Sequence, residues 1–301
     1  MYAQLNDIAA AFFANEQTDT KRVFHGRGQL YPGLEHLSVD WYPPVVLIST
    51  YEEIDDRDDL LDSVIAGDNH QQIESVLLQY RKRKGTPTIT LYKDTINHCV
   101  VFEQGMKFEV QPGVNQNAGL FLDMQPLRLW LKEDSLSKNV LNLFAYTCSL
   151  SVAALAGGAS QVVNVDMSKP SIKWGLRNHA LNDQDPRSVR SIPHNLFRSW
   201  GRIKQFGRYD TIIIDPPSRQ RGSFDVEKNY GVVLKKLKQL TKPKANIIAT
   251  VNSPYLYDDF LLNLVSRYAP QCRFQTMMPT SPEFADKYPE RALKIYRFTV
   301  G

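Results

Sequence analysis

The chain has 301 residues, 43% of them hydrophobic and 23% charged, and its net charge is +4 at neutral pH. That length is enough for one large domain or two ordinary ones, and the composition is that of a globular protein, which excludes a disordered or fibrous chain. The mild positive charge is compatible with a polyanionic partner without requiring one.

Cysteine usage and the N-terminal residues bear on the compartment. Cys99, Cys148 and Cys272 are widely spaced and form no C-x-x-C pair. This favours a reducing compartment and argues against a structural zinc site. The longest early apolar run, residues 8–14, is too short to span a bilayer, and no basic region precedes it. We therefore expect a cytoplasmic protein with no metal and no membrane partner.

The first hundred residues predict a small α+β domain. Apolar residues in 4–15 recur at helical spacing, which predicts a docking helix, with partner binding as the alternative. Gly and Pro separate short apolar runs, 37–40 and 45–51, which indicates hairpins. Lys21, Arg22, His25 and Arg27 precede these runs. They are either a solvated hairpin edge or a strip that contacts phosphates, and Arg22 is our candidate for substrate binding.

Residues 52–70 are acidic and polar, so they do not face a nucleic acid favourably. We predict a helix over 71–83 that ends in the basic run 81–84 and Gly85. Cations in a last turn before glycine are an ordinary helix end, and RNA contact is the alternative. Strands over 88–92, 98–103 and 107–110, with a turn at Gln104-Gly105, complete a domain spanning 1–112.

Residues 113–301 repeat strand and helix. Predicted strands end near residues 144, 166, 193, 215 and 251, and helices between them include 169–182 and 226–240. Such alternation predicts a parallel sheet with helices on both faces. Two β-rich runs, 273–278 and 293–300, add a terminal antiparallel hairpin. The expected fold is therefore α/β, a Rossmann-like domain with a seven-stranded, mostly parallel sheet.

The stretch 139–168 predicts half of a nucleotide-binding unit: a buried strand, a loop over 145–149, a short helix, Gly157-Gly158, and a second strand ending in Asp166. The loop after the first strand meets a polar ligand, and Asp166 can accept hydrogen bonds from a ribose. A dinucleotide site usually carries G-x-G-x-x-G, but this loop has no glycine. S-adenosylmethionine has no phosphate and tolerates side chains there, including the Thr147 and Ser149 hydroxyls. An α/β unit without a ligand is the alternative.

Residues 211–218, Thr-Ile-Ile-Ile-Asp-Pro-Pro-Ser, predict a buried strand that stops at two prolines. Prolines restrict their own φ and the residue before them, so the backbone at Asp215 and Pro216 is held in one shape. A rigid carbonyl and carboxylate here would face the same crevice as the loop after the first strand, and could orient a planar base. A simple strand-ending turn is the alternative.

These motifs together resemble the class I methyltransferases that modify large-subunit ribosomal RNA. The chain is most similar to the guanine-N7 methyltransferase half of the bifunctional bacterial 23S rRNA enzyme. The matching runs are Ala118 to Asp123, Asn142 to Thr147, Val165 to Ser168, Asp215 to Ser218, and Ser223 to Val226. The chain departs from the family at Cys148, where glycine is usual, and at Gln125, where arginine is usual.

The resemblance implies a cofactor, S-adenosylmethionine, and a set of site residues. Asn195 takes the place of the acid or amide that meets the adenine. The predicted cofactor-binding residues are Phe144, Ala145, Tyr146, Thr147, Ser149, Asp166, Met167, Ser168, Asn195 and Asp215. The predicted catalytic segment, which holds the guanine, is Asp215, Pro216, Pro217 and Ser218. Arg219 and Arg221 directly follow it and are the first candidates for contacts with RNA phosphates.

Reaction chemistry narrows the acceptor. Cytosine-C5 methylation needs a thiolate, but residues 250–253, where related enzymes carry that cysteine, read Thr-Val-Asn-Ser. Guanine N7 already offers a lone pair, so no general base is required. We therefore expect an RNA methyltransferase whose partner is ribosomal RNA. The alternatives are a small-molecule or protein acceptor, or a non-catalytic RNA-binding module that retains the fold.

Overall fold

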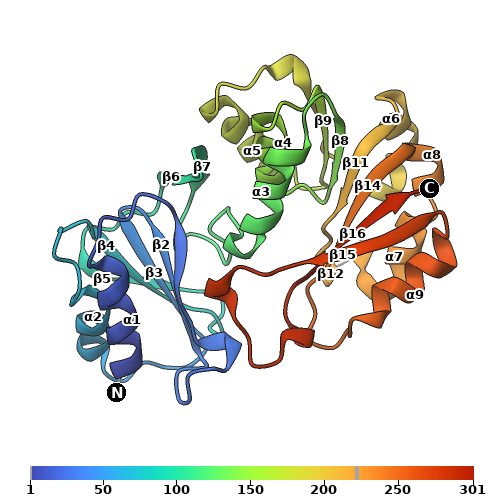
Figure 1. Cartoon of the computed structure of the whole chain (residues 1–301). Helices are drawn as coiled ribbons and strands as arrows, with labels where there is room; N and C mark the ends of the chain where they lie inside the picture. The colour runs from blue at the N-terminus through green and yellow to red at the C-terminus, as the bar shows by residue number, and fades with distance from the viewer. Residues whose placement is uncertain (1, 221–223) are drawn as a thin grey trace. The chain divides into compact units, whose positions relative to one another are not determined.

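The structure is a computed structural model that describes residues 2–220 and 224–301. The chain forms two compact units (Figure 1). The first comprises Met1–Asp123 together with Ser281–Tyr288, and the second comprises Met124–Thr280 together with Pro289–Gly301. The sequence analysis placed the domain boundary between residues 112 and 113 and assigned no C-terminal residues to the first domain.

The first unit contains a five-stranded sheet in the order β1-β2-β3-β4-β5. Neighbouring strands are antiparallel except β3 and β4, which are parallel and are joined through α2. Side chains of α1, α2 and the sheet share one hydrophobic core. The bounds are α1 Ala3–Phe13, β1 Lys21–His25, β2 Leu37–Tyr42, β3 Val45–Thr50, α2 Arg57–Ile65, β4 Ser75–Tyr80 and β5 Thr88–Lys93.

The helix predicted over 71–83 is wrong, because residues 75–80 form β4, whose six side chains are all buried. A strand between two others, shielded on both faces, has no polar alternation, so its apolar run cannot be told from a buried helix. The basic run 81–84 therefore follows a strand and leads into β5. The acidic stretch before β4 contains α2, which is capped where Asp56 accepts the Asp59 amide at 2.9 Å.

A separate hairpin, β6 (Cys99–Glu103) and β7 (Met106–Val110), forms at the predicted turn. Gln104 and Gly105 have φ values of 52° and 78°. Positive φ at both central residues characterises the two-residue turns that suit the twist of paired strands. The predicted hairpin is confirmed.

The second unit contains a seven-stranded sheet in the order β10-β9-β8-β11-β14-β16-β15. The first five strands in this order are parallel to one another, and β16 is antiparallel to both of its neighbours, β14 and β15. The predicted mostly parallel sheet and its terminal hairpin are confirmed. The strand bounds are β8 Asn139–Leu143, β9 Gln161–Val165, β10 Val189–Ile192, β11 Tyr209–Ile214, β14 Thr241–Val251, β15 Cys272–Met278 and β16 Lys294–Val300. A short pair, β12 (Arg219–Gln220) and β13 (Phe224–Asp225), follows β11.

Helices cover both faces of this sheet, with α4 and α5 on one side and α7 and α9 on the other (Figure 1). The helix bounds are α3 Gln125–Asp134, α4 Ser149–Ala156, α5 Lys169–Leu181, α6 Trp200–Gln205, α7 Val226–Leu234, α8 Leu237–Leu240 and α9 Asp259–Tyr268. Among the described residues, none of these helices has the length and apolar character needed to cross a membrane.

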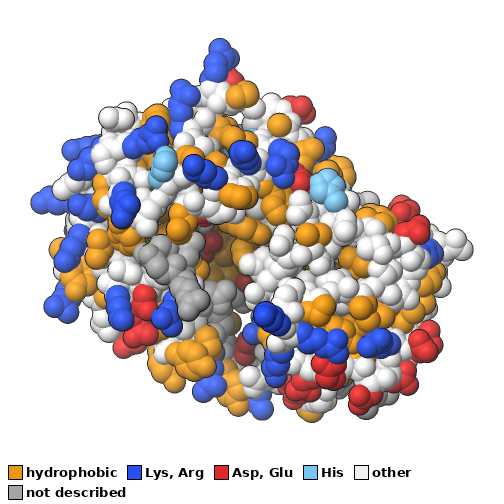
Figure 2. Space-filling view, turned by 180° about the vertical axis from the view of Figure 1, so that it is seen from behind, with side chains coloured by type: hydrophobic (Ala, Val, Ile, Leu, Met, Phe, Trp, Pro, Cys, Tyr) orange, Lys and Arg blue, Asp and Glu red, His pale blue; other side chains and the backbone are white. Residues whose placement is uncertain are grey.

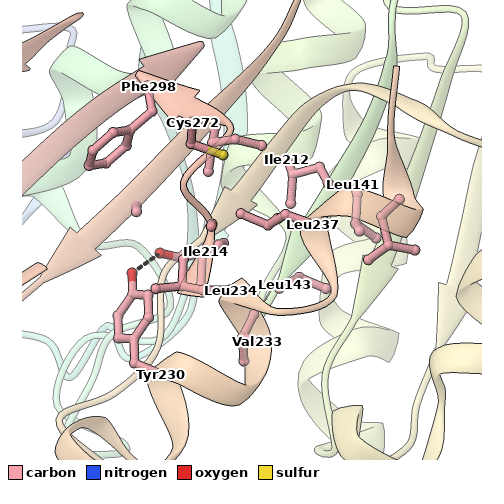
Figure 3. Packing of buried hydrophobic residues seen from close by; sticks show 14 of the residues in the cluster. Leu141, Leu143, Ile212, Ile214, Tyr230, Val233, Leu234, Leu237, Cys272 and Phe298 are labelled. Atoms are coloured by element: carbon pink, nitrogen blue, oxygen red, sulfur yellow. Dashed lines mark hydrogen bonds between the residues drawn. The ribbon is translucent and has the colours of Figure 1, made fainter. Parts of the chain in front are cut away.

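The larger core lies between the sheet and α7 to α9. Alternate residues of β8 and β11, such as Leu141, Leu143, Ile212 and Ile214, pack against side chains of α7 and α8 (Figure 3). Tyr230 of α7 is fully buried within this core, and its hydroxyl lies 3.3 Å from the Ile214 carbonyl. The core therefore reaches up to the ends of the central strands, where the predicted site residues begin.

Candidate active site

The predicted site segments begin side by side at the carboxyl edge of the large sheet. The last residue of β8, Leu143, pairs with the last residue of β9, Val165, on one side and of β11, Ile214, on the other. Phe144, Asp166 and Asp215 are the next residues of these strands and therefore lie at the same level. Because neighbouring strands are about 4.8 Å apart, the backbones of Asp166 and Asp215 are separated by roughly 10 Å, with the loop after β8 between them.

That loop has an uncommon backbone conformation. Phe144, Tyr146 and Cys148 have φ values of 61°, 46° and 64°. The left-handed region costs a non-glycine residue about 1–2 kcal/mol, and such residues cluster at ligand sites where surrounding contacts hold them. The left-handed cap at Cys148 explains why a glycine would suit this position.

Buried side chains hold the loop from behind. Asn178 of α5 donates to the Thr147 carbonyl at 2.9 Å, and the Ser151 hydroxyl donates to the Cys148 carbonyl at 3.0 Å. Thr147 is itself buried, whereas Ser149 is partly exposed at the start of α4. These contacts hold the backbone of the loop in its left-handed conformation.

The Cys148 side chain points toward α5. It packs with Ala145 and Ile172, and it occupies space that Gly175 leaves open, since a Cβ on Gly175 would lie 2.3 Å from the Cys148 sulfur. Burial raises the pKa of this thiol far above its ordinary value. Cys148 is therefore a packing residue in the protonated form, and not a nucleophile.

Asp166 joins the loop to the next strand end. One carboxylate oxygen accepts the Tyr146 amide at 2.9 Å, and the other accepts the Ser168 amide at 2.7 Å. Burial raises the pKa of Asp166, although both amide hydrogen bonds oppose this shift. Each oxygen retains a lone pair, so the carboxylate can also accept hydrogen bonds from a neighbouring diol.

The residues predicted to meet an adenine lie beyond Asp166. The Met167 side chain is 43% exposed, so an apolar surface is available beside the acid. Ser168 caps α5 by accepting the Ser171 amide. Asn195 follows β10, where its side-chain oxygen accepts the Phe197 amide at 2.9 Å. That contact orients the Asn195 amide group and leaves its nitrogen as a hydrogen-bond donor.

The segment 215–218 is fixed by β14. The Thr250 hydroxyl donates to the Asp215 carboxylate at 2.5 Å, and the Ser218 hydroxyl donates to the Asn252 carbonyl. Pro216 is buried, whereas Pro217 and Ser218 are exposed. Because neither proline has an N–H group, the turn from Asp215 to Pro217 presents carbonyl and carboxylate acceptors.

Sequence reasoning missed the contribution of Tyr230. Its hydroxyl lies 3.0 Å from the Thr250 carbonyl and 3.3 Å from the Ile214 carbonyl, so it links the ends of β14 and β11 beneath Asp215 (Figure 3). Only its position one turn into a helix after the proline motif could have suggested this role. Thr250 was noted in the sequence only as part of a segment without cysteine.

The predicted phosphate contacts differ in their surroundings. Arg22 makes a two-pronged ion pair with Asp40, at 2.5 and 3.2 Å, and its guanidinium lies 4.7 Å from the Phe284 ring centre. Its remaining nitrogen is 2.7 Å from His25. Within the first unit, Arg22 thus holds the segment Ser281–Tyr288 against β1.

Arg219, in contrast, is exposed directly after Ser218, and Arg221 lies outside the described residues. In the basic run 81–84, Arg83 pairs with Glu53 and lies 3.8 Å from the Tyr80 ring centre. Lys and Arg side chains occur across the face shown in Figure 2, interspersed with acidic and apolar ones. Of the predicted contacts within the second unit, Arg219 is thus the described one, and its side chain is exposed.

The residues at the ends of β8 and β9 fit S-adenosylmethionine in their chemistry. The Asp166 oxygens could accept hydrogen bonds from ribose hydroxyls, the exposed Met167 side chain offers an apolar surface, and the loop after β8 lacks the glycines that let a pyrophosphate approach the backbone. Among the described residues, no group of three or more His, Cys, Asp or Glu side chains could hold a metal ion.

Sequence comparison gives the same indication. A family described as S-adenosylmethionine-dependent methyltransferase matches residues 21–299. The "Ribosomal RNA large subunit methyltransferase K/L" of Hahella chejuensis is 30% identical over 237 residues, which cover 72% of this chain and 32% of that protein. The protein of the same name from Pseudoalteromonas translucida is 32% identical over 231 residues, with the same coverage. The chain thus matches about a third of the length of these relatives.

Solved structures share the fold. A candidate methyltransferase crystallised with SAH superimposes with a TM-score of 0.84 and 23% identity, covering 99% of this chain and 80% of that one. A SAM-dependent methyltransferase from Agrobacterium tumefaciens gives a TM-score of 0.67 with 18% identity, covering 88% and 87%. At these identities the likeness establishes the fold alone.

Proposed function

Because the chain belongs to the S-adenosylmethionine-dependent methyltransferase family, we propose that it methylates RNA, and that its acceptor is N7 of a guanine in 23S ribosomal RNA. As a member of this family the chain is an enzyme, and S-adenosylmethionine is its methyl donor. The observation that carries the proposal is the level alignment of Asp166, the loop after β8, and Asp215 on three neighbouring strands. The relatives named for ribosomal RNA support the choice of substrate.

The donor side is assigned residue by residue. Asp166 accepts hydrogen bonds from the ribose hydroxyls, and Met167 covers one face of the adenine. The Asn195 amide nitrogen donates to an adenine ring nitrogen. The loop 144–149 contacts the methionine part through its backbone and the Ser149 hydroxyl. When bound, the cofactor supplies a methyl group attached to a positively charged sulfur.

At the part of the site that would bind the methyl acceptor, the hydrogen-bond acceptors of the protein match the N–H groups of guanine. Guanine carries N–H donors on its Watson–Crick edge and the N7 lone pair on the opposite, major-groove edge. The acceptors of Asp215, Pro216 and Pro217 can hold the first edge. The Asp215 carboxylate and the Ser218 hydroxyl are already hydrogen-bonded to β14 and its loop. Neither is needed as a base, because N7 loses no proton before it attacks.

The raised pKa values of the three cysteine thiols favour a reaction without a covalent intermediate. Burial raises the pKa of Cys99 to about 12 and that of Cys272 to about 11. The pKa of Cys148 is raised further, and its side chain faces α5. A cytosine-C5 acceptor would require a thiolate beside the base. Catalysis in this site is therefore positioning of the base and cofactor, which can contribute about 7–11 kcal/mol in well-oriented reactions.

Access to N7 also limits the form of the RNA. In an RNA helix the major groove is deep and narrow, so the target guanine must lie in a loop or turn out of the stack. Exposed Arg219, directly after Ser218, is placed to contact a phosphate of the extruded nucleotide. A cytoplasmic location, with access to ribosomal RNA, follows from this proposal.

Two experiments test the proposal. Asp166→Asn retains one acceptor oxygen for the loop but removes the charge, so calorimetry should show at least tenfold weaker S-adenosylmethionine binding, since a hydrogen bond to a charged group contributes about 1.5–3 kcal/mol. Asp185→Asn is the control, because that exposed acid precedes β10 at the opposite edge of the sheet. Unchanged affinity in folded Asp166→Asn would contradict the assignment.

The acceptor is identified by mass mapping of nucleosides in 23S ribosomal RNA from cells with and without the chain. We expect one 7-methylguanosine to disappear, and to return with the wild-type chain but not with Asp215→Ala. An unchanged nucleoside map would refute the RNA acceptor.

A further inference from the structure

The loop between β14 and α9, residues 252–258, has the sequence Asn-Ser-Pro-Tyr-Leu-Tyr-Asp, and beyond Asn252 its residues have no role in the site described above. Its position is set by β14, which pairs in parallel with β11, so the loop leaves the sheet at the same edge as Asp215. The Ser218 hydroxyl donates to the Asn252 carbonyl. The loop is therefore in direct contact with the segment that holds the acceptor base.

The middle of the loop is anchored to β16. The Lys294 amine donates to the Leu256 carbonyl at 3.0 Å, and the Tyr296 hydroxyl donates to the Asp258 carbonyl at 3.0 Å. Lys294 is only 2% exposed, and burial lowers its pKa. A buried amine is costly unless it is hydrogen-bonded, so its contact with Leu256 holds this part of the loop in place.

Two tyrosines flank the anchored residue and extend into solvent. Tyr255 is 85% exposed and Tyr257 is 57% exposed, whereas Leu256 between them packs against the core. Single exposed aromatic residues are common on protein surfaces. Here two exposed tyrosines lie on one anchored loop, which contacts the segment 215–218, so their rings are available to a planar group near the site.

We propose that Tyr255 and Tyr257 are a stacking surface for an unpaired RNA base next to the methylated guanine. This inference rests on the proposed RNA acceptor, and it adds a binding site on a different loop. Aromatic side chains recognise single-stranded RNA by stacking on its bases, and each stacked base contributes about 1–3 kcal/mol. A guanine in a single-stranded loop has unpaired neighbours, so bases that can stack on such a surface would be available beside the site.

The charges around the loop favour a base over a phosphate. Asp258 and Asp259 are exposed directly after Tyr257, and their carboxylates would repel a phosphate there. An exposed cation, Arg219, follows Ser218 at the other side of the contact. The backbone of the RNA would therefore pass near Arg219, while its bases lie on the tyrosines.

The test measures binding of a fluorescein-labelled, single-stranded RNA of about twelve nucleotides that carries the sequence around the mapped guanine. Tyr255→Ala and Tyr257→Ala should each weaken binding about 5- to 100-fold, which corresponds to the loss of one stacked base. Tyr255→Phe and Tyr257→Phe keep the ring and should stay within about twofold of wild type. S-adenosylmethionine affinity should be unchanged in all four variants, which shows that the fold is intact.

Leu136→Ala is the matched control. Leu136 is 74% exposed but precedes β8, at the opposite edge of the sheet, so its loss should leave RNA binding unchanged. If both alanine variants bind and methylate RNA as wild type does, the stacking surface is refuted while the proposed function stands. Equal weakening by Leu136→Ala, or loss of binding in the phenylalanine variants, would also refute it. If wild type neither binds nor methylates this RNA, both proposals fail.

Discussion

The contact between Cys148 and Gly175 predicts that Gly175→Ala destabilises the protein when residue 148 is cysteine and stabilises it when residue 148 is glycine. A Cβ at position 175 would lie 2.3 Å from the Cys148 sulfur and 2.7 Å from its Cβ. Overpacking of this kind costs about 1–3 kcal/mol. The helix propensity of alanine returns only about 1 kcal/mol relative to glycine. Gly175→Ala should therefore destabilise the wild-type chain by up to about 2 kcal/mol.

In a Cys148→Gly background the clash is absent, and Gly175→Ala should stabilise α5 by up to about 1 kcal/mol. The gain is limited because the carbonyl carbon of Thr147 remains 3.1 Å from the new Cβ. Cys148→Gly alone should be nearly neutral. Glycine relieves the left-handed strain at φ 64°, but the buried contact with Ile172 is lost.

The assay is thermal unfolding of the four chains of this double-mutant cycle, in which 1 kcal/mol corresponds to about 2–4 °C. Gly201→Ala is the control, because a Cβ there meets no atom within 4 Å and its effect should be the same in both backgrounds. The reasoning is wrong if Gly175→Ala has the same effect, within about 0.5 kcal/mol, whether residue 148 is cysteine or glycine.

Three further predictions concern contacts that sequence patterns did not reveal. Tyr230→Phe removes the hydroxyl that links the ends of β11 and β14, and it should lower unfolding free energy by about 1 kcal/mol and reduce kcat more than cofactor affinity. Asp40→Asn leaves the Arg22 guanidinium without its counter-charge and should lower stability by about 3–5 kcal/mol in urea unfolding, whereas an effect below 1 kcal/mol would contradict the pairing. Burial, together with the charges of Arg22 and Arg27, lowers the pKa of His25 to about 3. Below pH 6.5 the His25 imidazole therefore takes up a proton in the unfolded chain but stays neutral in the folded chain. Stability should therefore fall as pH decreases from 6.5 toward 3, and His25→Gln should reduce that slope.

Much of the second unit was predictable because its signals are local. The parallel strands β9, β10, β11 and β14 are each followed at once by a polar residue or a proline, and the stops at Asp166 and Asp215 mark the same edge of the sheet. Parallel pairing then places those stops together without any knowledge of side-chain packing.

The errors and omissions come from contacts between distant parts of the chain. The strand β4 was predicted as a helix because its burial depends on β3 and β5, which only the folded sheet brings alongside. The segment Ser281–Tyr288 lies between the two runs that were predicted to form the terminal hairpin, yet Phe284 packs on Arg22, more than 250 residues earlier. No periodicity in either stretch could indicate such a partner.

The two halves of the candidate site therefore differ in how far a sequence can specify them. Most of the cofactor side is built by one strand-loop-helix-strand segment, so a deletion or substitution within 139–168 acts on it directly. Asn178 of α5 and Asn195 after β10 are added from outside it. The acceptor side depends on Thr250, Tyr230 and Asn252, which hold a proline turn that cannot adjust by itself. These supports come from β14, the loop after it and α7. Substitutions there can therefore change which acceptor base is bound, while the proline motif and the cofactor-binding residues stay the same.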